Sequence, residues 1–600
     1  MTSNSVDKLE ILKDVFGYDS FRPGQEAVVD CLLEGKHVLA VMPTGAGKSL
    51  CFQVPALVFD QLTIVVSPLV ALMDDQVASL RVAGVAAAAL HSGREHEENV
   101  EIWRQVEEGA IKLLYLAPER LMNAKMLRSL SRLPVSMFAI DEAHCISQWG
   151  PAFRPEYEGL AQLKELFPGV PIAAMTATAD EATRSDIASK LFDNNNEQFM
   201  TGFDRKNIRL SVEMKSDWKR QLIAFLKAHI DESGIIYCLS RKKTEEVAAF
   251  LEGEGFPALA YHAGLSKEIR SANQERFLKE DHVIMAATIA FGMGIDKPDV
   301  RFVFHTDLPG SLEAYYQEIG RAGRDGRDAV AHMLYGLGDI RMRRQFIENE
   351  DSDEFRKRQE HKRLDALLGF CEAPRCRRTT LLAYFGEKID ACGNCDSCLT
   401  PQPLFEGTRE GQMALSAVLR TGQRYGAAHI VDVLTGADTE KIREQFHHKL
   451  PTFGVGKEHP KVLWRSILRQ LVAGSFLRLD VSGYGSLQLT ENSRALLKGE
   501  ADFQFRKDTV STKKEKRSRP IRVDLSEHDQ ALLGKLKAVR LSLAQERGVP
   551  PYIIFSDRSL EDMAARRPGN SDQFADVHGV GDAKLRDFGI IFLEAISAVE

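Results

Sequence analysis

Short apolar runs of strand length recur through the first half of the chain, and stretches with helical periodicity separate them. The runs cover residues 36–42, 63–68, 111–117, 136–141 and 171–176. Such alternation predicts a parallel sheet with covering helices. A second set of apolar runs, at residues 234–238, 283–287 and 302–304, predicts a second α/β domain after the first.

The second half of the chain is divided by its composition. Charged residues are dense over 341–363, a cysteine cluster follows, and two prolines at 401–403 mark a break. Residues 406–500 mix helical periods with a Gly-rich hairpin near Tyr484, and the basic run 513–520 predicts a flexible linker. We therefore predict domains at 1–208, 209–340, 341–403 and 404–503, a linker at 504–522 and a small helical domain at 523–600.

Composition restricts the class of protein. A chain of 600 residues exceeds one hydrophobic core, and 44% hydrophobic with 27% charged residues is ordinary for a soluble globular protein. The apolar runs are too short to span a membrane and the N-terminus lacks a signal-peptide pattern, which predicts a cytosolic protein. A formal charge of −7 argues against a basic surface along the whole chain, so any nucleic-acid site must be local.

A glycine-rich segment follows the first predicted strand and ends in Lys48 and Ser49. Gly45 and Gly47 let a turn bring backbone N–H groups close to phosphates. Lys48 would place a cation at the β- and γ-phosphates, and Ser49 would offer a hydroxyl to Mg²⁺. The segment predicts an ATP site. Because Met42 replaces the first glycine of the usual pattern, an incidental Gly-rich turn is the alternative for this segment taken alone.

Two carboxylates end the fourth predicted strand, and two arginines follow Gln317 in the second α/β domain. Asp141 can hold the Mg²⁺ shell while Glu142 orients or deprotonates the attacking water. Arg321 and Arg324 can neutralise charge that develops on the γ-phosphate. Because these arginines would come from the second domain, hydrolysis would be linked to closure of a cleft and hence to movement. A helix N-cap pair and a surface turn are the structural alternatives for the two segments.

Four cysteines form a metal-binding pattern late in the chain. Cys376, Cys392, Cys395 and Cys398 have the spacing C-x₁₅-C-x₂-C-x₂-C. The short spacings let backbone turns aim several thiolates at one tetrahedral centre, and disulfides are rare in a reducing cytosol. The pattern predicts a structural zinc site, because four thiolates leave no open position for catalysis.

Several motifs, taken together, closely resemble RecQ-type DNA helicases of superfamily 2. They are Phe21-Arg22-Pro23-Gly24-Gln25, the loop ending in Lys48-Ser49, Asp141-Glu142-Ala143-His144, Ala290–Pro298 and Gln317–Arg324. The resemblance extends from about residue 8 to the C-terminus. It implies two RecA-like parallel-sheet domains, a zinc-binding helical segment, a winged-helix domain and a small helical HRDC-like bundle.

The resemblance also implies roles for particular residues. Tyr18, Arg22 and Gln25 would contact adenine, and Thr44 would belong to the ATP-binding loop with Gly45, Gly47, Lys48 and Ser49. The segment after the acidic motif resembles an aromatic-rich loop that couples single-strand binding to hydrolysis. Candidates for DNA binding and coupling are Trp149, Phe153, Arg154, Tyr157, Thr176 and Thr178. An apolar plug between domains is the structural alternative for the aromatic residues.

One departure from the family pattern lies inside the aromatic-rich loop. Pro151-Ala152 stands where the family usually has His-Asp. Proline removes a hydrogen-bond donor and alanine removes a carboxylate. We therefore expect DNA to stimulate ATP hydrolysis more weakly, or through other residues, and we expect ATP-driven movement to be retained.

The C-terminal region resembles two auxiliary domains. Residues 406–500 resemble the family's winged-helix domain, which would hold the duplex side of a fork; a protein-binding winged helix is the alternative. Residues 524–600 resemble the HRDC domain, carried by Val549–Tyr552 and His578–Gly581. For this last domain, auxiliary DNA binding and contact with the motor are equally open.

The sequence as a whole predicts an ATP-dependent DNA helicase that translocates on single-stranded DNA and unwinds duplexes in repair and recombination. By resemblance its polarity is 3′-to-5′ and its cofactors are ATP, Mg²⁺ and Zn²⁺. The expected partners are single-stranded and forked DNA and a single-strand-binding protein, for a monomer in the bacterial cytoplasm associated with the nucleoid. Two alternatives stay open: an RNA helicase, and a nucleotide-gated DNA-binding scaffold with weak unwinding.

Overall fold

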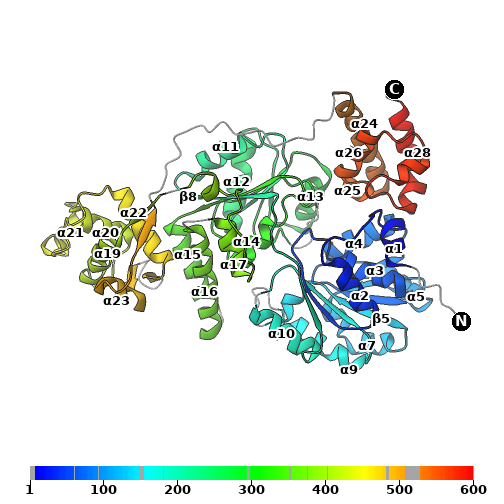
Figure 1. Ribbon diagram of the computed structural model, residues 1–600, viewed down its shortest axis with the longest axis horizontal. Helices are drawn as coiled ribbons and strands as arrows, with labels where there is room; N and C mark the ends of the chain where they lie inside the picture. The colour runs from blue at the N-terminus through cyan, green and yellow to red at the C-terminus, as the bar shows by residue number, and fades with distance from the viewer. Residues whose placement is uncertain are drawn as a thin grey trace.

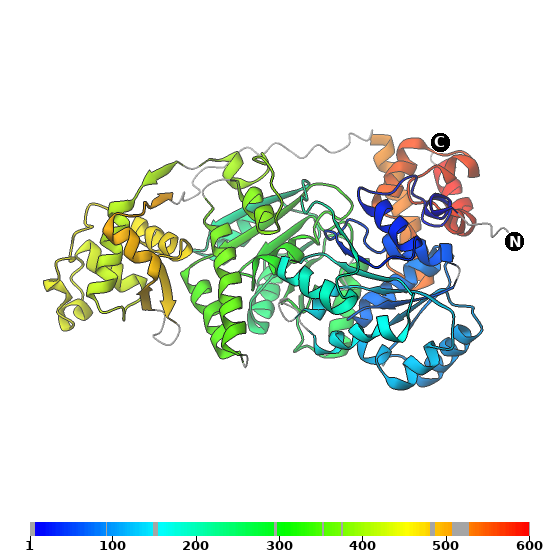
Figure 2. The same ribbon diagram turned by 60° about the horizontal axis from the view of Figure 1, so that its bottom comes forward.

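The computed structural model covers the 600-residue chain as an elongated molecule (Figure 1). A domain of helices and a hairpin lies at one end, the second helix-covered sheet lies in the middle, and the first sheet lies at the other end with a helical bundle beside it. Figure 2 shows the same order from a second direction. The structure describes residues 7–598 except 60, 92, 148–153, 180, 293–296, 351–352, 374–375, 402, 481–485 and 507–526.

The first sheet has seven parallel strands in the order β3-β4-β2-β5-β6-β1-β7. Leu39 and Phe138 pack on one face, while Ala40 and Met137 pack on the other. Burial on both faces explains why the strands other than the exposed edge strand β7 are largely apolar and do not alternate with polar residues. The strands are β1 (Val38–Val41), β2 (Leu62–Val66), β3 (Ala87–Leu90), β4 (Leu113–Leu116), β5 (Val135–Ile140), β6 (Ile172–Thr176) and β7 (Glu197–Met200).

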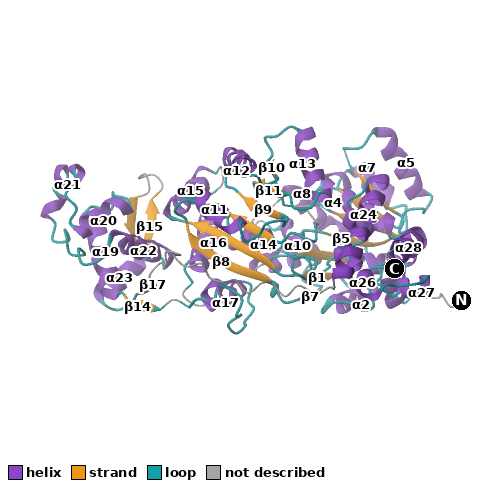
Figure 3. Ribbon diagram, turned by 90° about the horizontal axis from the view of Figure 1, so that it is seen from above, coloured by secondary structure: helices purple, strands orange, loops and turns teal. Residues whose placement is uncertain are grey.

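Helices lie on both sides of this sheet (Figure 3). They are α1 (Lys8–Asp14), α2 (Gln25–Leu33), α3 (Leu50–Phe59), α4 (Val70–Val82), α5 (His96–Glu107), α6 (Pro118–Leu121), α7 (Ala124–Leu130), α8 (Pro155–Glu158), α9 (Leu163–Leu166) and α10 (Glu181–Phe192), with 3₁₀ helices η1 (Ala143–Ile146) and η2 (Gly159–Gln162). Because β5, β6 and β1 are neighbours and parallel, the segments that follow them meet at one edge of the sheet.

The second sheet has six parallel strands in the order β10-β11-β9-β12-β13-β8. Its strands are β8 (Ile208–Met214), β9 (Gly234–Tyr237), β10 (Ala258–Tyr261), β11 (Ile284–Ala287), β12 (Phe302–His305) and β13 (Ala329–Tyr335). Its helices are α11 (Trp218–Leu226), α12 (Arg241–Gly253), α13 (Lys267–Lys279), α14 (Leu312–Ile319) and α15 (Leu337–Asn349). The predicted pair of RecA-like parallel-sheet domains is confirmed.

The zinc-binding segment and the winged-helix domain follow. The segment contains α16 (Glu354–Cys371), α17 (Arg377–Tyr384) and α18 (Asp396–Leu399). The winged-helix domain contains α19 (Thr408–Arg420), α20 (Ala427–Thr435), α21 (Glu440–Glu444), η3 (His447–Lys449), α22 (Lys461–Ala473) and α23 (Glu491–Lys498), with the antiparallel pairs β14 (Leu404–Glu406) and β17 (Gln504–Arg506), and β15 (Leu477–Asp480) and β16 (Ser486–Leu489). The predicted hairpin near Tyr484 lies outside the described residues.

A buried charged cluster, defined as Tyr335, Glu372, Arg469 and Arg506, joins the winged-helix domain to the second sheet. The Glu372 carboxylate accepts hydrogen bonds from Arg469 on α22, from the Tyr335 hydroxyl on β13, and from Arg506 Nη2 at 3.1 Å. Arg469 is 1% exposed and Glu372 is 9% exposed. Buried charges must be paired, so this cluster fixes where the winged-helix domain sits.

The C-terminal bundle consists of α24 (Glu527–Arg547), α25 (Pro551–Ile554), α26 (Asp557–Arg566), α27 (Ser571–Ala575) and α28 (Asp582–Ser597). It has its own apolar core, to which Phe555, Phe574 and Phe592 belong. Its helix α25 packs against α4 of the first RecA-like domain. No helix within the described part of the chain is long and apolar enough to cross a membrane.

Candidate functional site

The glycine-rich loop connects β1 to α3 at the carboxyl edge of the first sheet. Gly45 and Gly47 have φ of +84° and +80°, the left-handed region that glycine adopts without steric cost. The Lys48 side chain folds back over the loop, and its Nζ donates to the Met42 carbonyl at 3.2 Å. Burial lowers the pKa of Lys48, whereas Glu142 and Asp141 act to raise it. The loop thus places a half-buried cation beside a glycine-rich turn, as a phosphate site requires.

Two acidic residues lie at the same edge of the sheet, directly after β5. Burial raises the pKa of Asp141 to about 7, with Glu142 adding to the rise and Lys48 opposing it. Glu142 has φ of 51°, an uncommon left-handed conformation for a residue with a side chain. A divalent cation would favour the ionised carboxylates, so this pair fits the Mg²⁺ that accompanies ATP.

Ser49 is held by two residues that the sequence analysis did not identify. Gln76 on α4 donates from Nε2 to Ser49 Oγ at 3.2 Å. The buried Tyr115 hydroxyl on β4 donates to Gln76 Oε1 at 2.9 Å. This relay orients the hydroxyl that would face Mg²⁺.

The predicted arginines come from the second RecA-like domain and line the same cleft as Lys48. The cleft has a volume of about 580 Å³. Its lining includes Tyr18, Arg22, Thr44, Gly45, Gly47, Lys48, Ser49, Asp141, Glu142, Gln317, Arg321 and Arg324. Arg321 is 8% exposed and its Nη1 donates to the Gly292 carbonyl. The cleft therefore brings together predicted residues from two separate sheets.

One close polar contact followed by a series of hydrogen bonds connects the acidic motif to the second domain. Glu142 lies 3.3 Å from Nδ1 of His144, and this nitrogen lies 2.9 Å from Thr176 Oγ1. The Thr176 hydroxyl donates to the Thr178 carbonyl at 3.1 Å, and Gln317 Nε2 donates to Thr178 Oγ1 at 2.8 Å. Because the Thr176 proton is used on Thr178, His144 Nδ1 must carry the proton that it shares with Thr176. We call these residues the coupling chain: Glu142, His144, Thr176, Thr178 and Gln317.

Arg205 makes a second connection across the cleft that the sequence analysis missed. Its guanidinium donates to the Thr44 carbonyl in the phosphate loop and to the Gly320 carbonyl at 3.2 Å. It also donates to the carbonyls of Ala322 and Gly323, each at 2.9 Å. A single side chain thus bridges the phosphate loop and the arginine-bearing loop. Only the tertiary fold gives this signal, because Arg205 stands in no recognisable motif.

Gln25 differs from the expected adenine contact. It is 1% exposed, and its Nε2 donates to the carbonyls of Ala46 and Gly47, each at 2.9 Å. Its Oε1 accepts from the Arg22 backbone N–H at 2.8 Å. Both amide protons therefore bind carbonyls of the phosphate loop, and Gln25 stabilises the conformation of this loop. Arg22 lines the cleft, and its Nη1 donates to the Gly45 carbonyl at 2.5 Å.

Residues 148–153 of the aromatic-rich loop lie outside the described residues, and with them the predictions for Trp149, Phe153 and the pair Pro151-Ala152. Arg154 donates from Nη1 to the Pro68 carbonyl at 3.2 Å. Tyr157 is 0% exposed, and its hydroxyl donates to the Asp141 carbonyl at 3.1 Å. Its ring cannot stack on a base from this position, contrary to expectation. Tyr157 instead connects the end of the loop to the backbone of the acidic motif.

The four predicted cysteines converge in the zinc-binding segment. The sulfur atoms of Cys376, Cys392, Cys395 and Cys398 all lie within 4.8 Å of one another. Cys376 caps the N-terminus of α17, and the Cys392 backbone N–H donates to its sulfur at 3.3 Å. Four soft ligands at this separation suit tetrahedral Zn²⁺. The zinc prediction is confirmed, and a closed shell of four thiolates makes the ion structural.

Five family models match the chain in succession and cover most of it. They are DEAD/DEAH box helicase at residues 22–187, helicase conserved C-terminal domain at 217–326, RecQ zinc-binding at 337–399, RQC domain at 401–514 and HRDC domain at 529–596. Their order follows the two sheets, the cysteine cluster, the winged helix and the bundle.

Three bacterial relatives align along almost the whole chain, and each is named ATP-dependent DNA helicase RecQ. The protein of Haemophilus influenzae is 43% identical and covers 98% of this chain and 95% of its own length. That of Pasteurella multocida is 41% identical, with coverage of 98% and 93%. That of Bacillus subtilis is 37% identical, with coverage of 98% of both chains. The chain therefore belongs to the RecQ family of ATP-dependent DNA helicases.

Proposed function

We propose that this protein uses ATP hydrolysis to move along single-stranded DNA in the 3′-to-5′ direction and to separate duplexes during repair and recombination. The coupling chain is the observation that carries the proposal, because it links the residues beside the phosphates to the second RecA-like domain. A hydrolase without movement would need no such connection between two separate sheets.

In the proposed hydrolysis step, Lys48 and the backbone of its loop hold the β- and γ-phosphates. Ser49 and Asp141 would hold Mg²⁺, which offsets phosphate charge when it is bound. Glu142 orients the attacking water and accepts its proton. Arg321 and Arg324 stabilise the charge that develops on the γ-phosphate, as arginines supplied from a second domain do in other phosphoryl-transfer sites.

The coupling chain would convert this chemistry into domain movement. Burial lowers the pKa of His144, so its imidazole is neutral at pH 7. The polar contacts with Glu142 and Thr176 would then set the position of the ring. When the product phosphate leaves and Glu142 gives up the proton that it took from water, the change would reach Gln317 through the coupling chain. Gln317 lies on α14, the helix that leads into Arg321 and Arg324. The bonds of Arg205 to both loops would keep the two domains in register during this cycle.

Single-stranded and forked DNA are the proposed substrates, with the winged helix gripping the duplex. Arg154 and the aromatic-rich loop that precedes it would contact the single strand near the acidic motif. We further propose that the protein acts as a monomer in the bacterial cytoplasm, associated with the nucleoid, and meets single-strand-binding protein on the same DNA. Co-sedimentation with that protein, with and without DNA, tests the last point.

Steady-state ATP hydrolysis with no nucleic acid, with single-stranded DNA and with single-stranded RNA tests the function. We expect strong stimulation by DNA. Gln317→Ala should reduce the DNA-stimulated kcat about tenfold, the effect of losing one interdomain hydrogen bond worth about 1.4 kcal/mol. Gln198→Ala, an exposed glutamine on β7, is the matched control and should be neutral.

The alternatives predict different outcomes of the same assay. Stimulation by RNA alone would indicate an RNA helicase, and no response to DNA would indicate a scaffold. Replacing the departing pair, as Pro151→His with Ala152→Asp, should increase DNA stimulation. Unchanged stimulation would show that Pro151-Ala152 does not weaken the coupling.

A further inference from the structure

A short linker, residues 201–207, connects β7 of the first sheet to β8 of the second. The Tyr316 hydroxyl on α14 donates to the Phe203 carbonyl of this linker at 2.8 Å. Phe203 is 2% exposed, and its ring stacks on Phe385 of the zinc-binding segment with centroids 4.8 Å apart. These buried contacts give the linker one position, unlike an exposed linker that has few contacts.

The zinc-binding segment also holds the backbone of the linker. Glu387 accepts a hydrogen bond from the Phe203 N–H at 2.6 Å. Asn394, in the turn between two cysteines of the cluster, donates from Nδ2 to the Lys206 carbonyl at 3.0 Å. The position of the linker therefore depends on the zinc-binding segment at two separate places.

Arg205 extends from the middle of this linker into the interface between the two RecA-like domains. Its guanidinium donates to three carbonyls of the arginine-bearing loop, residues 320–327, which are those of Gly320, Ala322 and Gly323. These carbonyls lie on both sides of Arg321 and directly before Arg324. The same guanidinium donates to the Thr44 carbonyl in the phosphate loop. One planar group with several donors thus relates the positions of the two loops.

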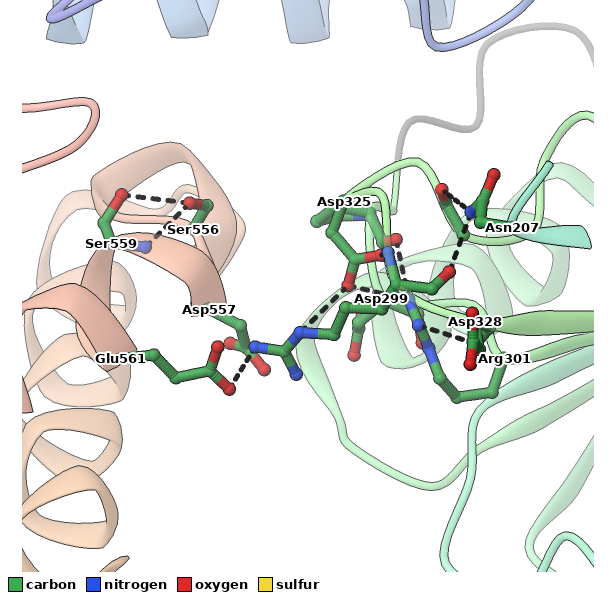
Figure 4. Close-up of polar contacts among 12 residues, drawn as sticks. Asn207, Asp299, Arg301, Asp325, Asp328, Ser556, Asp557, Ser559 and Glu561 are labelled. Carbon is green, nitrogen blue, oxygen red and sulfur yellow. Dashed lines mark hydrogen bonds and ion pairs between the residues drawn. The ribbon is translucent and has the colours of Figure 1, made fainter. Parts of the chain in front are cut away.

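Asn207 holds the arginine-bearing loop from the other end of the linker. Its Nδ2 donates to the Gly323 carbonyl at 2.9 Å and to the Arg327 carbonyl at 2.7 Å. Figure 4 shows Asn207 beside this loop, which also contains Asp325. Gly323 has φ of +58°, and a Cβ atom added there would collide with the Asn207 amide. The linker and the loop therefore fit closely and are expected to move together.

The two loops that Arg205 connects are held in different ways. The phosphate loop is fixed from within the first domain, because Arg22 and Gln25 donate to its carbonyls. The arginine-bearing loop belongs to the second domain, so the distance of Arg321 and Arg324 from the phosphates depends on contacts across the cleft. Loss of the Arg205 side chain should displace these arginines and leave the phosphate loop in place.

We propose that Arg205 is a positioning residue for ATP hydrolysis, which sets Arg321 and Arg324 relative to the phosphate loop, and that the zinc-binding segment holds Arg205 in place through the linker. This inference rests on the proposed hydrolysis in the cleft. It adds a residue that the reaction requires and a route from the zinc-binding segment to the nucleotide.

The test measures kcat and KM for ATP at saturating single-stranded DNA, together with equilibrium binding of fluorescent N-methylanthraniloyl ADP. Arg205→Ala removes the contacts with both loops. Arg205→Lys keeps the charge, but one ammonium group cannot replace a planar guanidinium that donates to carbonyls on two loops. Arg209→Ala is the matched control, since the side chain of this arginine on β8 forms no hydrogen bond or ion pair within the described part of the chain.

We expect Arg205→Ala to lower kcat about tenfold, the loss of one net hydrogen bond across the cleft. KM and the Kd of the fluorescent ADP should change by less than about twofold, because an interaction that acts only in the transition state alters kcat alone. Arg205→Lys should behave as Arg205→Ala does, and Arg209→Ala should match the wild type. Thermal melts verify that each variant is folded.

Two double variants test the route of the effect. In an Arg321→Ala background, Arg205→Ala should lower kcat by clearly less than it does alone, because one of the residues that it positions is gone. Glu387→Ala should lower kcat about threefold alone and have no further effect in an Arg205→Ala background, since both act on the same linker.

Several results would overturn the inference. They are a wild-type kcat in Arg205→Ala, rescue by Arg205→Lys, a loss of ADP affinity that parallels the loss of kcat, and strictly additive effects with Arg321→Ala. A wild-type kcat in Glu387→Ala would overturn the route from the zinc-binding segment. In each of these cases the wild type still hydrolyses ATP and the proposed function stands, whereas absence of hydrolysis by the wild type would contradict the proposed function itself.

Discussion

The winged-helix domain and the C-terminal bundle are attached to the motor in opposite ways. Buried charges attach the winged helix, since Glu372 is enclosed by Arg469, Arg506 and Tyr335. Among the described residues, the bundle is attached by glycine-lined backbone contacts and by an ion pair between Glu561 and Arg327, of which Arg327 is 40% exposed. Figure 1 places the two domains at opposite ends of the molecule.

This difference shows which domain can move during a catalytic cycle. Separating the residues of a buried charged cluster leaves charges unpaired in the low-dielectric protein interior, which is costly. The winged-helix domain is therefore expected to stay fixed. A half-exposed ion pair and a small apolar contact are each worth little, so the bundle can undock and dock again. A winged-helix domain that stays fixed suits a grip on duplex DNA. A bundle that can undock suits a neighbouring site whose nucleotide is exchanged in every cycle.

Removal of zinc should produce the largest difference between the winged-helix domain and the C-terminal bundle. Zinc binding supplies about 10–16 kcal/mol of folding free energy in small zinc domains, so a chelator should unfold residues 376–399 and loosen the winged helix. The bundle, which has its own core, should stay folded and docked. Hydrogen exchange by mass spectrometry checks this. Cys395→Ala should lose zinc, whereas Cys371→Ala, outside the cluster, should retain it; equal loss of protection in the bundle would contradict the account.

The buried charged cluster should be far more sensitive to a single amide replacement than the bundle's ion pair. Glu372→Gln leaves Arg469 and Arg506 buried without a counter-charge, which costs about 3–5 kcal/mol. Glu561→Gln, the same chemical change at a half-exposed site, should cost about 0.2–1 kcal/mol. Hydrogen exchange of α22 and α26 in increasing urea measures both. Similar losses of stability in the two variants would contradict the distinction between a fixed winged-helix domain and a bundle that can undock.

Mild acid should undock the C-terminal bundle and leave the winged-helix domain attached. The pKa of His578 is lowered by burial in the docked state, so docking is strongest above about 6.5 and weakens as the pH falls through the docked pKa. Protonation there meets Arg558 and Arg22, and Asp562 offsets this only in part. Burial raises the pKa of Glu372, but Arg469 and Arg506 outweigh it and lower the pKa overall, so the winged-helix domain stays attached.

Nucleotide release between pH 7.5 and pH 5 measures this dependence. Release from the wild type should accelerate severalfold as the pH falls. His578→Gln should remove the part of this dependence that comes from docking, because glutamine does not titrate in this range, and the part that comes from Asp141 should remain. A wild-type rate that stays constant across the range would contradict the assignment of His578 to the docking surface.

The smallest expected effect comes from reversing the interdomain ion pair. Glu561→Arg should speed nucleotide release by at most about fivefold, since exposed pairs contribute up to about 1 kcal/mol. Combining it with Arg327→Glu should restore the rate if the pair is direct, and high salt should diminish the difference between variants. A double variant that is no slower than Glu561→Arg would indicate that the pair does not hold the bundle.

The sequence predicted those parts of the fold that depend on local pattern. The apolar runs of the first domain overlap with β1, β2, β4, β5 and β6, because strands buried on both faces are largely apolar. In the second sheet it missed β8, β10 and β13. In the first sheet it missed β3, whose Ala87–Leu90 segment lacks β-branched side chains, and the exposed β7. Both strands lie at the edges of the sheet, where pairing partners and not side-chain pattern define a strand.

The candidate site was predictable where residues stand in motifs, as Lys48 and Asp141 do. The connections between motifs were not, because they depend on which segments the fold brings together. Arg205 bonds carbonyls of Thr44 and Gly320, which lie 161 and 115 residues away along the chain. That Arg558 and His578 of the bundle line the cleft depends in the same way on where the bundle docks.

Strand separation from tailed duplexes tests the central claim, that hydrolysis in this cleft drives movement along DNA. The account predicts ATP-dependent unwinding of a duplex with a 3′ single-stranded tail, little unwinding with a 5′ tail, and none for Lys48→Ala. Vigorous DNA-stimulated hydrolysis by the wild type without strand separation on either substrate would contradict it and support the scaffold alternative.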